Sequence, residues 1–435
     1  LLNNAFDNIA NNINLKETAI VVFNQLDFNR SDLVECELPD GFKNIEIRDK
    51  QGNLMASQII EDKEGKEKLL FFAEDIPAKG YKTFSIKKGI DKISESSIKI
   101  AKDKLSNQFF DIKFDEQANI ESIYDKKNQR EILQSGAKAN QLQAFEDKAL
   151  LWDAWDTHLF YQEKSWNVNN VQSTEIVENG AVRATLKIVR EFMDSTIEQY
   201  IHIYNHLPRI DISNRIDWQE KQMLLKVAFP VDIHSNKATY EIQYGNVERS
   251  THWNTSWDKA KFEVVGHKWV DLSEDNYGVS LLNDCKYGHD IKDQVMRLTL
   301  IKSAIRPNED ADRGLHEFVY SLYPHQGDWK EGQTVQKAYE LNCPLHAKIE
   351  EAHTGQLPTE YSFVELDQEN VVLEVIKQAE DNDDIIIRLY ECYNRRSQVE
   401  VNLAHDLETV WECDLNENNI KKLLADKKQF SFVIE

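Results

Sequence analysis

The sequence predicts an all-β protein in which a short N-terminal helix precedes one large and two smaller β-sandwiches. Short β-branched or alternating apolar runs, bounded by Gly, Pro or polar turns, recur along most of the chain. No βαβ unit and no Gly-rich phosphate loop interrupts them. The length of 435 residues exceeds what one hydrophobic core supports, so the strands should divide among several domains.

Residues 1–15 are predicted to be the end of a helical bundle. Leu2, Phe6, Ile9 and Ile13 recur every three to four residues, which places them on one stripe of a short helix. A helix of this length is marginal alone and needs packing partners. The stripe therefore indicates the last helix of a bundle.

Residues 16–92 are predicted to form the first small sandwich. Their apolar runs are short and separated by turns, one of which is Pro77-Ala78-Lys79-Gly80. A polar linker, Lys92–Ser97, follows. The predicted strands lie in 19–23, 33–38, 68–72 and 83–86.

Residues 93–350 are predicted to form a much larger sandwich, because long alternating segments continue over about 250 residues. After a turn-rich patch at 353–358, strands return and predict a terminal sandwich over 351–435. The clearest strands of the large sandwich lie in 109–114, 197–204, 210–212 and 227–231, and those of the terminal sandwich lie in 371–375, 385–390, 399–403 and 430–434.

Charge and cysteine usage narrow the possible partners. The formal net charge is −23 and no Lys/Arg-rich stripe occurs, which argues against nucleic acid and against anionic membranes. No apolar run approaches bilayer length. Five scattered cysteines form no CxxC pair, which is typical of free thiols in a reducing cytoplasm. The chain begins at Leu1 without a signal-peptide pattern, which we interpret as a piece of a longer cytoplasmic protein.

A sugar-facing surface is the functional interpretation of residues 249–288. Trp253, Trp257 and Trp269 offer flat apolar faces, and short polar residues among them offer donors and acceptors for hydroxyls. An ordinary strand–loop–strand core is the alternative, since tryptophans in β proteins mostly serve packing. The polar candidates are His252, Asn254, Thr255, Ser256 and Asp258.

A second candidate lies in the Trp152–Asp156 segment. Asp153 and Asp156 stand three apart between Trp152 and Trp155, so the rings could desolvate a pocket carboxylate and raise its pKa. The alternative is a Trp-anchored turn with capping aspartates. A zinc site within the chain is not expected, because His202 and His206 lie on a strand pattern that would separate them by about 13 Å.

At these residues the chain resembles the C-terminal half of the glycoside hydrolase family 38 α-mannosidases, with the cytosolic-type enzymes as the nearest group. The resemblance follows the whole chain in order and carries the WDAWD and THWNTSWD motifs. The matching blocks are Asn107–Phe110, Phe145–Asp147, Trp152–Asp156, Thr251–Asp258, His267–Trp269, Leu281–Gly288, Ala311–Phe318, Tyr323–His325, Ala379–Asp381 and Arg388–Glu391.

The resemblance implies a large sandwich of the galactose-mutarotase-like type. It also implies that the aspartate nucleophile and the zinc ligands, or those of another divalent metal, belong to an N-terminal barrel domain absent from this chain. By position, the Asn254–Ser256 segment, Arg313 and the Trp152–Asp156 loop resemble residues that reach the sugar beyond the cleaved bond. The alternatives are that Trp155 and Trp269 belong to the core and that Asp312 and Arg313 form an internal ion pair.

The resulting hypothesis is a retaining α-mannosidase of the cytoplasm that acts on mannose-containing oligosaccharides. This chain would supply scaffold and the aglycon-side pocket wall for its own N-terminal catalytic domain, with no metal of its own. An autonomous carbohydrate-binding module without catalysis is the alternative. A mutarotase-like epimerase would need a His/Glu acid–base pair inside the large sandwich, and the sequence nominates none.

Overall fold

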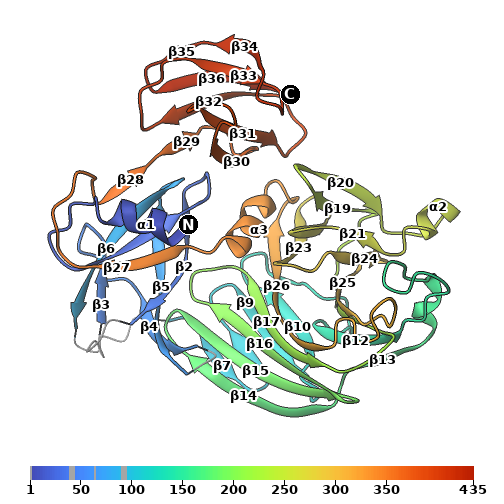
Figure 1. Ribbon diagram of the computed structural model, residues 1–435. Helices are drawn as coiled ribbons and strands as arrows, with labels where there is room; N and C mark the ends of the chain where they lie inside the picture. The colour runs from blue at the N-terminus through green and yellow to red at the C-terminus, as the bar shows by residue number, and fades with distance from the viewer. Residues whose placement is uncertain (1, 39–44, 63–64, 90–95) are drawn as a thin grey trace. The chain divides into compact units, whose positions relative to one another are not determined.

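A computed structural model describes residues 2–38, 45–62, 65–89 and 96–435, which fall into two compact units. Unit 1 joins residues 1–94 to 343–435, and unit 2 comprises 95–342. Both consist almost entirely of antiparallel strands (Figure 1). The all-β prediction is confirmed. Among the helices in the described ranges, none is long and apolar enough to cross a membrane.

The first part of unit 1 is a sandwich of two sheets on which the N-terminal helix packs. Its core lies between the sheets, where Val22, Val34, Phe71 and Phe84 are fully buried. On the other side of the first sheet, helix α1 (Leu2–Ala10) and the residues after it pack against Phe23 and its neighbours. The first sheet runs β27 (His346–Glu350), β1 (Ala19–Asn24), β6 (Gly80–Lys88), β28 (Glu360–Ser362), and β3 (Ile45–Arg48) also pairs with β6. The second sheet runs β2 (Arg30–Glu37), β5 (Glu67–Ile76), β4 (Ser57–Glu61).

Two strands of the first sheet come from beyond residue 343. Strand β27 pairs with β1 and strand β28 pairs with β6. The sequence places 346–350 in the large sandwich, whereas here these residues complete the first sheet. Alternation predicts that a strand exists, but its partner is set by contacts between distant segments.

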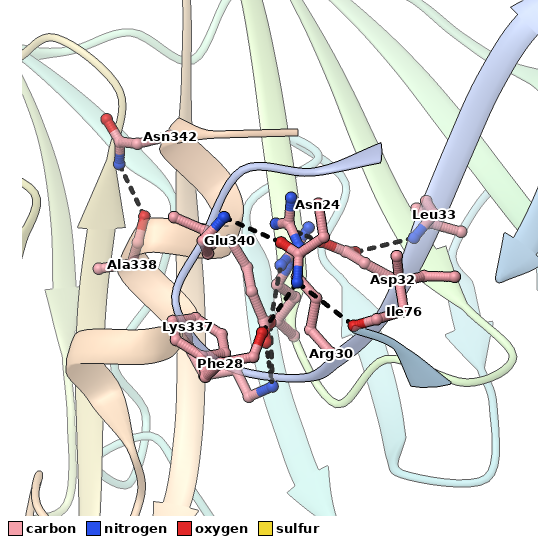
Figure 2. A network of polar contacts seen from close by, with 12 residues as sticks. Asn24, Phe28, Arg30, Asp32, Leu33, Ile76, Lys337, Ala338, Glu340 and Asn342 are labelled. Atoms are coloured by element: carbon pink, nitrogen blue, oxygen red, sulfur yellow. Dashed lines mark hydrogen bonds and ion pairs between the residues drawn. The ribbon is translucent and has the colours of Figure 1, made fainter. Parts of the chain in front are cut away.

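Asn24 holds the connection between β1 and β2. Its Nδ2 donates to the backbone oxygens of Phe28, at 2.8 Å, and of Ile76, at 3.3 Å (Figure 2). Its Oδ1 accepts from the Leu26 amide at 3.0 Å. Because buried backbone groups need partners, this one side chain replaces ladder bonds that the turn lacks.

The C-terminal sandwich follows in the same unit. Its core includes Leu373, Val399, Val401 and Phe430, and partly buried apolar residues surround them. The strands expected from 371, 385, 399 and 430 onward are confirmed. The four-stranded sheet runs β29 (Val364–Leu366), β32 (Ser397–Leu403), β36 (Gln429–Ile434), β35 (Ala425–Asp426), and two hairpins are β30 (Val371–Gln378) with β31 (Ile385–Glu391) and β33 (Val410–Cys413) with β34 (Asn419–Leu423).

Unit 2 is the large sandwich that the sequence predicts. Figure 1 shows the long strands β14 to β17 side by side, and they belong to the nine-stranded sheet. That sheet runs β14 (Val171–Asn179), β15 (Arg183–Phe192), β16 (Ser195–Tyr204), β17 (Ile210–Trp218), β26 (Gly314–Gln326), β23 (Tyr277–Asn283), β22 (Trp269–Ser273), β19 (Lys237–Ile242), β20 (Gly245–Ser250).

Two further sheets complete unit 2. One core of buried apolar side chains draws on strands of all three sheets. The six-stranded sheet runs β13 (Ser165–Asn167), β12 (Gln141–Glu146), β18 (Met223–Pro230), β25 (Val295–Lys302), β24 (Gly288–Lys292), β21 (Val264–Val265), and the five-stranded sheet runs β11 (Arg130–Glu131), β10 (Ile120–Asp125), β9 (Phe110–Phe114), β8 (Lys104–Ser106), β7 (Lys99–Ala101).

Short helices lie outside these sheets: η1 (Leu159–Glu163), α2 (Ser256–Lys259) and α3 (Thr334–Asn342). Helix α3 contacts β22 and β23. In its last turn the Asn342 amide donates to the Ala338 oxygen at 2.9 Å, and Lys337 pairs with Glu340 at 2.8 Å (Figure 2). These local bonds stabilise a helix of only nine residues.

Trp218 is the largest side chain fully enclosed in the unit 2 core. Its ring stacks on Phe192 at 6.0 Å, and its Nε1 donates to Ser303 Oγ at 3.1 Å. Trp218→Ala should therefore lower the free energy of unfolding of unit 2 by about 3–5 kcal/mol, measured by urea denaturation. The matched variant Trp257→Ala removes an exposed ring and should change it by less than about 0.5 kcal/mol. Equal effects of both variants would contradict this packing.

Candidate functional site

The outer face of the six-stranded sheet carries a polar layer beneath two loops. Along β18, Leu225 and Val227 point into the core, so Lys226 between them lies on the opposite face. Phe145, Leu224 and Tyr161 form a small apolar cluster on that outer face. Tyr161 belongs to η1, and the cluster is completed by Phe262, which follows α2.

Lys226 is the centre of this layer and is fully buried. Its Nζ pairs with Asp290 at 2.5 Å and with Glu263, and it contacts the Tyr161 hydroxyl at 3.1 Å. Asp290 Oδ1 also pairs with Arg297 Nη1 at 2.9 Å. Two cations thus face two carboxylates, which is the balance that a buried charge cluster requires.

Lys226 and Tyr161 keep their ordinary charge states near neutral pH. Burial lowers the pKa of Lys226, but the carboxylates of Asp290 and Glu263 outweigh it and raise the pKa above its ordinary value. Burial raises the pKa of Tyr161 to about 12. A general acid or base needs a pKa near the working pH, so neither group is suited to that role. The cluster positions the loops above it.

The loop between β12 and η1 is anchored at its first residue, Asp147. Asp147 is buried, pairs with Lys302, and donates its backbone N–H to the Gln222 oxygen at 2.8 Å. Burial raises the pKa of Asp147, Lys302 lowers it, and the nearby charges of Asp153 and Asp156 raise it further. Burial is the largest of these causes, so the pKa of Asp147 lies above its ordinary value although Lys302 pairs with it.

The Trp152–Asp156 segment is a tight turn with exposed rings. The amides of Trp155 and Asp156 both donate to the Trp152 oxygen, at 2.8 and 2.9 Å. Asp153 Oδ2 accepts from the Ile305 amide at 2.7 Å, so this carboxylate anchors the turn. The two rings meet edge-on at 6.3 Å and are 70% and 74% exposed. The alternative that Trp155 belongs to the core is wrong, whereas Trp269 is buried as the same alternative predicts.

The second candidate segment begins helix α2 with a capping box. Thr255 Oγ accepts from the Asp258 amide at 3.1 Å and donates to its carboxylate at 2.7 Å. This hydrogen bond is the largest cause that lowers the pKa of Asp258. His252 Nδ1 lies 3.7 Å from the same carboxylate. The side chains of Asn254 and Ser256 remain exposed to solvent.

Arg313 is held within the loop that leads into β26. It pairs with Asp310 at 2.7 Å and donates to the backbone and side-chain oxygens of Gln219 at 3.1 and 3.2 Å. Arg313 therefore forms an internal ion pair, as the alternative to sugar contact predicts, but its partner is Asp310 and not Asp312. A guanidinium engaged in this way has fewer donors left for a sugar.

The structure brings most of the predicted residues into two groups within unit 2. Trp152, Asp153, Trp155 and Asp156 sit in a loop anchored on residues 302–305. Arg313 belongs to neither group and is bound to Asp310 and Gln219. The α2 residues form the second group, next to the outer face of the six-stranded sheet. Phe262, which follows α2, packs there with its ring 6.4 Å from that of Tyr161.

Sequence reasoning missed the charged layer itself. A signal was available in Met223–Pro230, where one lysine stands in an otherwise apolar strand. A lysine in such a strand is almost never buried without a partner. Its partners Glu263 and Asp290, and the Arg297 that pairs with Asp290, could not be found, because they come from separate segments.

No three His, Cys, Asp or Glu side chains in the described ranges lie close enough to hold a metal ion. His202 on β16 is buried between Thr185, at 2.8 Å, and Ser213, at 3.1 Å. Burial lowers the pKa of His202 to about 4. His202 does not fit a zinc ligand, because both of its ring nitrogens already bond to hydroxyl groups.

Two family models match the chain. "Glycosyl hydrolases family 38 C-terminal domain" covers residues 105–310, and "Glycosyl hydrolases family 38 C-terminal beta sandwich domain" covers residues 370–435. Both candidate segments, 152–156 and 252–258, fall within the first match.

Curated relatives include α-mannosidase G of Dictyostelium discoideum, 33% identical over 341 residues, and human α-mannosidase 2C1, 35% identical over 318 residues. These alignments cover 75% and 72% of this chain but 31% and 30% of the relatives. The chain therefore spans under a third of the length of these relatives. An α-mannosidase structure from Enterococcus faecalis has the same fold, with TM-score 0.79 at 17% identity over 99% of this chain and 58% of that one.

The variant Lys226→Met tests how much the buried charged network contributes to the free energy of unfolding. At pH 7 it leaves Glu263 and Asp290 without their shared cation, and we expect a loss of about 3–5 kcal/mol in unfolding free energy. Arg297 still pairs with Asp290 in this variant, so the loss reports the missing ammonium of Lys226. Urea denaturation at pH 7 measures it.

The matched control is Lys237→Met, which breaks an exposed pair with Glu248. It should cost less than about 1 kcal/mol at pH 7. A Lys226→Met protein as stable as the parent at pH 7 would show that the cluster does not hold the loops.

Proposed function

Because this chain belongs to glycoside hydrolase family 38, we propose that it forms the C-terminal part of an α-mannosidase that hydrolyses α-mannosidic bonds in oligosaccharides. The observation that carries the proposal is the 35% identity to human α-mannosidase 2C1. The order of the two matched family domains along the chain supports it. We place the enzyme in the cytoplasm, as for the cytosolic-type members of the family.

In this proposal the chain binds and orients the substrate, and the reacting groups lie elsewhere in the longer polypeptide. The relatives extend far beyond the part that aligns with this chain, which leaves room for a catalytic domain. That domain would carry the nucleophile of a retaining reaction and the ligands of zinc or another divalent metal. Within this chain, Lys226 and Tyr161 keep their ordinary charge and serve as supports.

The sugar-contacting residues in this proposal lie on the two loops above the charged layer. Asn254 and Ser256 keep exposed side chains that can donate to and accept from hydroxyls. Trp152 and Trp155 present exposed rings on which a sugar can stack, with Asp156 beside them. The remaining candidates, His252, Thr255, Asp258, Asp153 and Arg313, are engaged with protein partners and would act by shaping these loops.

The direct test of the function compares two polypeptides. The product of the complete reading frame that contains this chain should hydrolyse an aryl α-mannoside and lose that activity to a chelator. The 435-residue chain alone should show no turnover above the uncatalysed rate. Micromolar binding of mannose oligosaccharides by the isolated chain, with no hydrolysis by the complete protein, would favour a binding module instead.

Asn254→Ala with Ser256→Ala tests the aglycon-side contact in the complete protein. Two lost hydrogen bonds should raise KM for a mannose oligosaccharide by roughly 5- to 50-fold. KM for an aryl α-mannoside, which lacks the further sugars, should stay within about twofold. The control Asn416→Ala alters an exposed residue of the C-terminal sandwich and should change neither value. Equal changes for both substrates would place these residues away from the aglycon.

A further inference from the structure

A group of polar side chains lies inside unit 2, where one end of the nine-stranded sheet packs on the six-stranded sheet. Its members are Tyr240 on β19, Arg249 on β20 and His289 on β24. The ring centroids of Tyr240 and His289 lie 6.3 Å apart, and Arg249 Cζ lies 4.6 Å from the centroid of the Tyr240 ring. These three side chains come from separate strands and meet at one place, which we call the inner donor cluster.

Alternation along the strands directs the inner donor cluster into the sandwich. Arg249 comes two residues after Val247 on β20, and Val247 packs against the core of unit 2. His289 lies opposite Leu298 of β25, which is a fully buried member of the same core. Tyr240 itself belongs to that core. The guanidinium of Arg249 and the imidazole of His289 therefore point between the sheets.

His289 brings an unpartnered donor to this cluster. The side chain is completely buried, and no residue of the described ranges forms a hydrogen bond with either ring nitrogen. Burial and, after it, the charge of Lys226 lower the pKa of His289 to about 3, and the charge of Arg249 acts in the same direction. The imidazole is therefore neutral and carries one N–H. A buried N–H of this kind is stabilised by an acceptor beside it.

Arg249 brings a second unpartnered donor and a positive charge. Its Nη1 is buried without a hydrogen-bond partner, and no carboxylate in the described part of the chain pairs with its guanidinium. The carboxylates of Asp290 and Glu263 are bound by Lys226 on the outer side of the six-stranded sheet. Because a guanidinium stays protonated and buried charges are normally paired, the cluster calls for a negative partner.

We propose that the inner donor cluster binds a monovalent halide ion. The ion would accept hydrogen bonds from Arg249 Nη1 and from the N–H of His289, and its charge would neutralise the guanidinium. A metal cation is a poorer occupant, because it would be repelled by Arg249. The inference goes beyond the proposed function and does not depend on it.

The packing around the cluster favours a small ion over a polyatomic one. Gly266 closes one side, since a Cβ atom at this position would lie 3.2 Å from His289 Cδ2 and 3.3 Å from Tyr240 Cδ1. Contacts this close leave the ring atoms no slack on that side. A spherical ion needs only donors within reach, whereas a phosphate or a carboxylate needs room for several further atoms.

The ion would also stabilise the strand from which the candidate segment at 251–258 departs. Arg249 lies two residues before Thr251, whose Oγ1 donates to the Ser235 oxygen at 2.7 Å. Ser250 Oγ donates to Asp258 Oδ1 at 3.0 Å and so joins the end of β20 to α2. Neutralising Arg249 removes the repulsion that opposes its position between the sheets.

Anomalous X-ray scattering locates the ion directly, with bromide as the probe. Crystals of the product of the complete reading frame, grown in sodium bromide, should show an anomalous peak between Arg249 and His289. A water molecule at this place without an anomalous signal would overturn the proposal. Bromide found only at the protein surface would overturn it as well.

Hydrogen–deuterium exchange in the same protein measures binding in solution. Peptides covering 238–250 and 287–292 are compared in sodium bromide and in sodium gluconate. An ion that binds only the closed form slows local opening by 1 + [L]/Kd, so a millimolar site at about 100 mM bromide should slow exchange roughly tenfold or more. Peptides of the C-terminal sandwich should exchange equally in both salts. Binding at crystal concentration only, with equal exchange of all peptides in both salts, would contradict the proposal.

Two variants assign the ion to the cluster. Arg249→Gln removes the cation and should abolish both the anomalous peak and the effect of bromide on exchange. His289→Phe keeps a flat ring, removes the unpartnered nitrogens without loss of the fold, and should weaken the bromide effect at least fivefold. The control Arg215→Gln alters an exposed arginine of β17 in the same sheet and should change neither readout.

The variants also keep the test decisive. If Arg249→Gln does not fold, the result for His289→Phe decides alone. A bromide effect of parental size in His289→Phe would show that the ion, if bound, lies elsewhere, and would overturn the assignment to the inner donor cluster.

Discussion

The two-residue alternation of the six-stranded sheet is the constraint on which the candidate site depends. Leu225 and Val227 fill the core of unit 2, so Lys226 between them must face outward. There it is buried by η1 and the segment after α2, and burial obliges it to take Asp290 and Glu263 as partners. The loops that bear the exposed tryptophans rest on this arrangement, because Tyr161 of η1 contacts the same ammonium.

Much of the fold could be predicted because strands are a local property. Runs such as 197–204 and 399–403 alternate or are β-branched, and both are strands. The pairing of strands is not local, so the placement of His346–Glu350 beside β1 differs from the expected domain limits. An alternating pattern indicates which residues share a face, but it does not indicate which strand pairs with them.

The candidate site was less predictable, for a different physical reason. Trp155 lies in a loop and is exposed, whereas Trp269 is the first residue of β22 and is buried. A loop has no period from which the burial of Trp155 can be inferred. Likewise, Arg313 selects Asp310 over adjacent Asp312 because the turn geometry, and not proximity in sequence, decides which carboxylate it meets.

In the proposed function, this chain offers supports with fixed charges, exposed rings and exposed polar side chains. The proposed catalytic part supplies the groups that break the bond. The most direct measurement is covalent trapping of the complete protein with a fluorinated mannosyl fluoride that stalls the glycosyl–enzyme intermediate, followed by peptide mass spectrometry. The account predicts the mannosyl label on a peptide outside residues 1–435, and a label on any residue within them would contradict it.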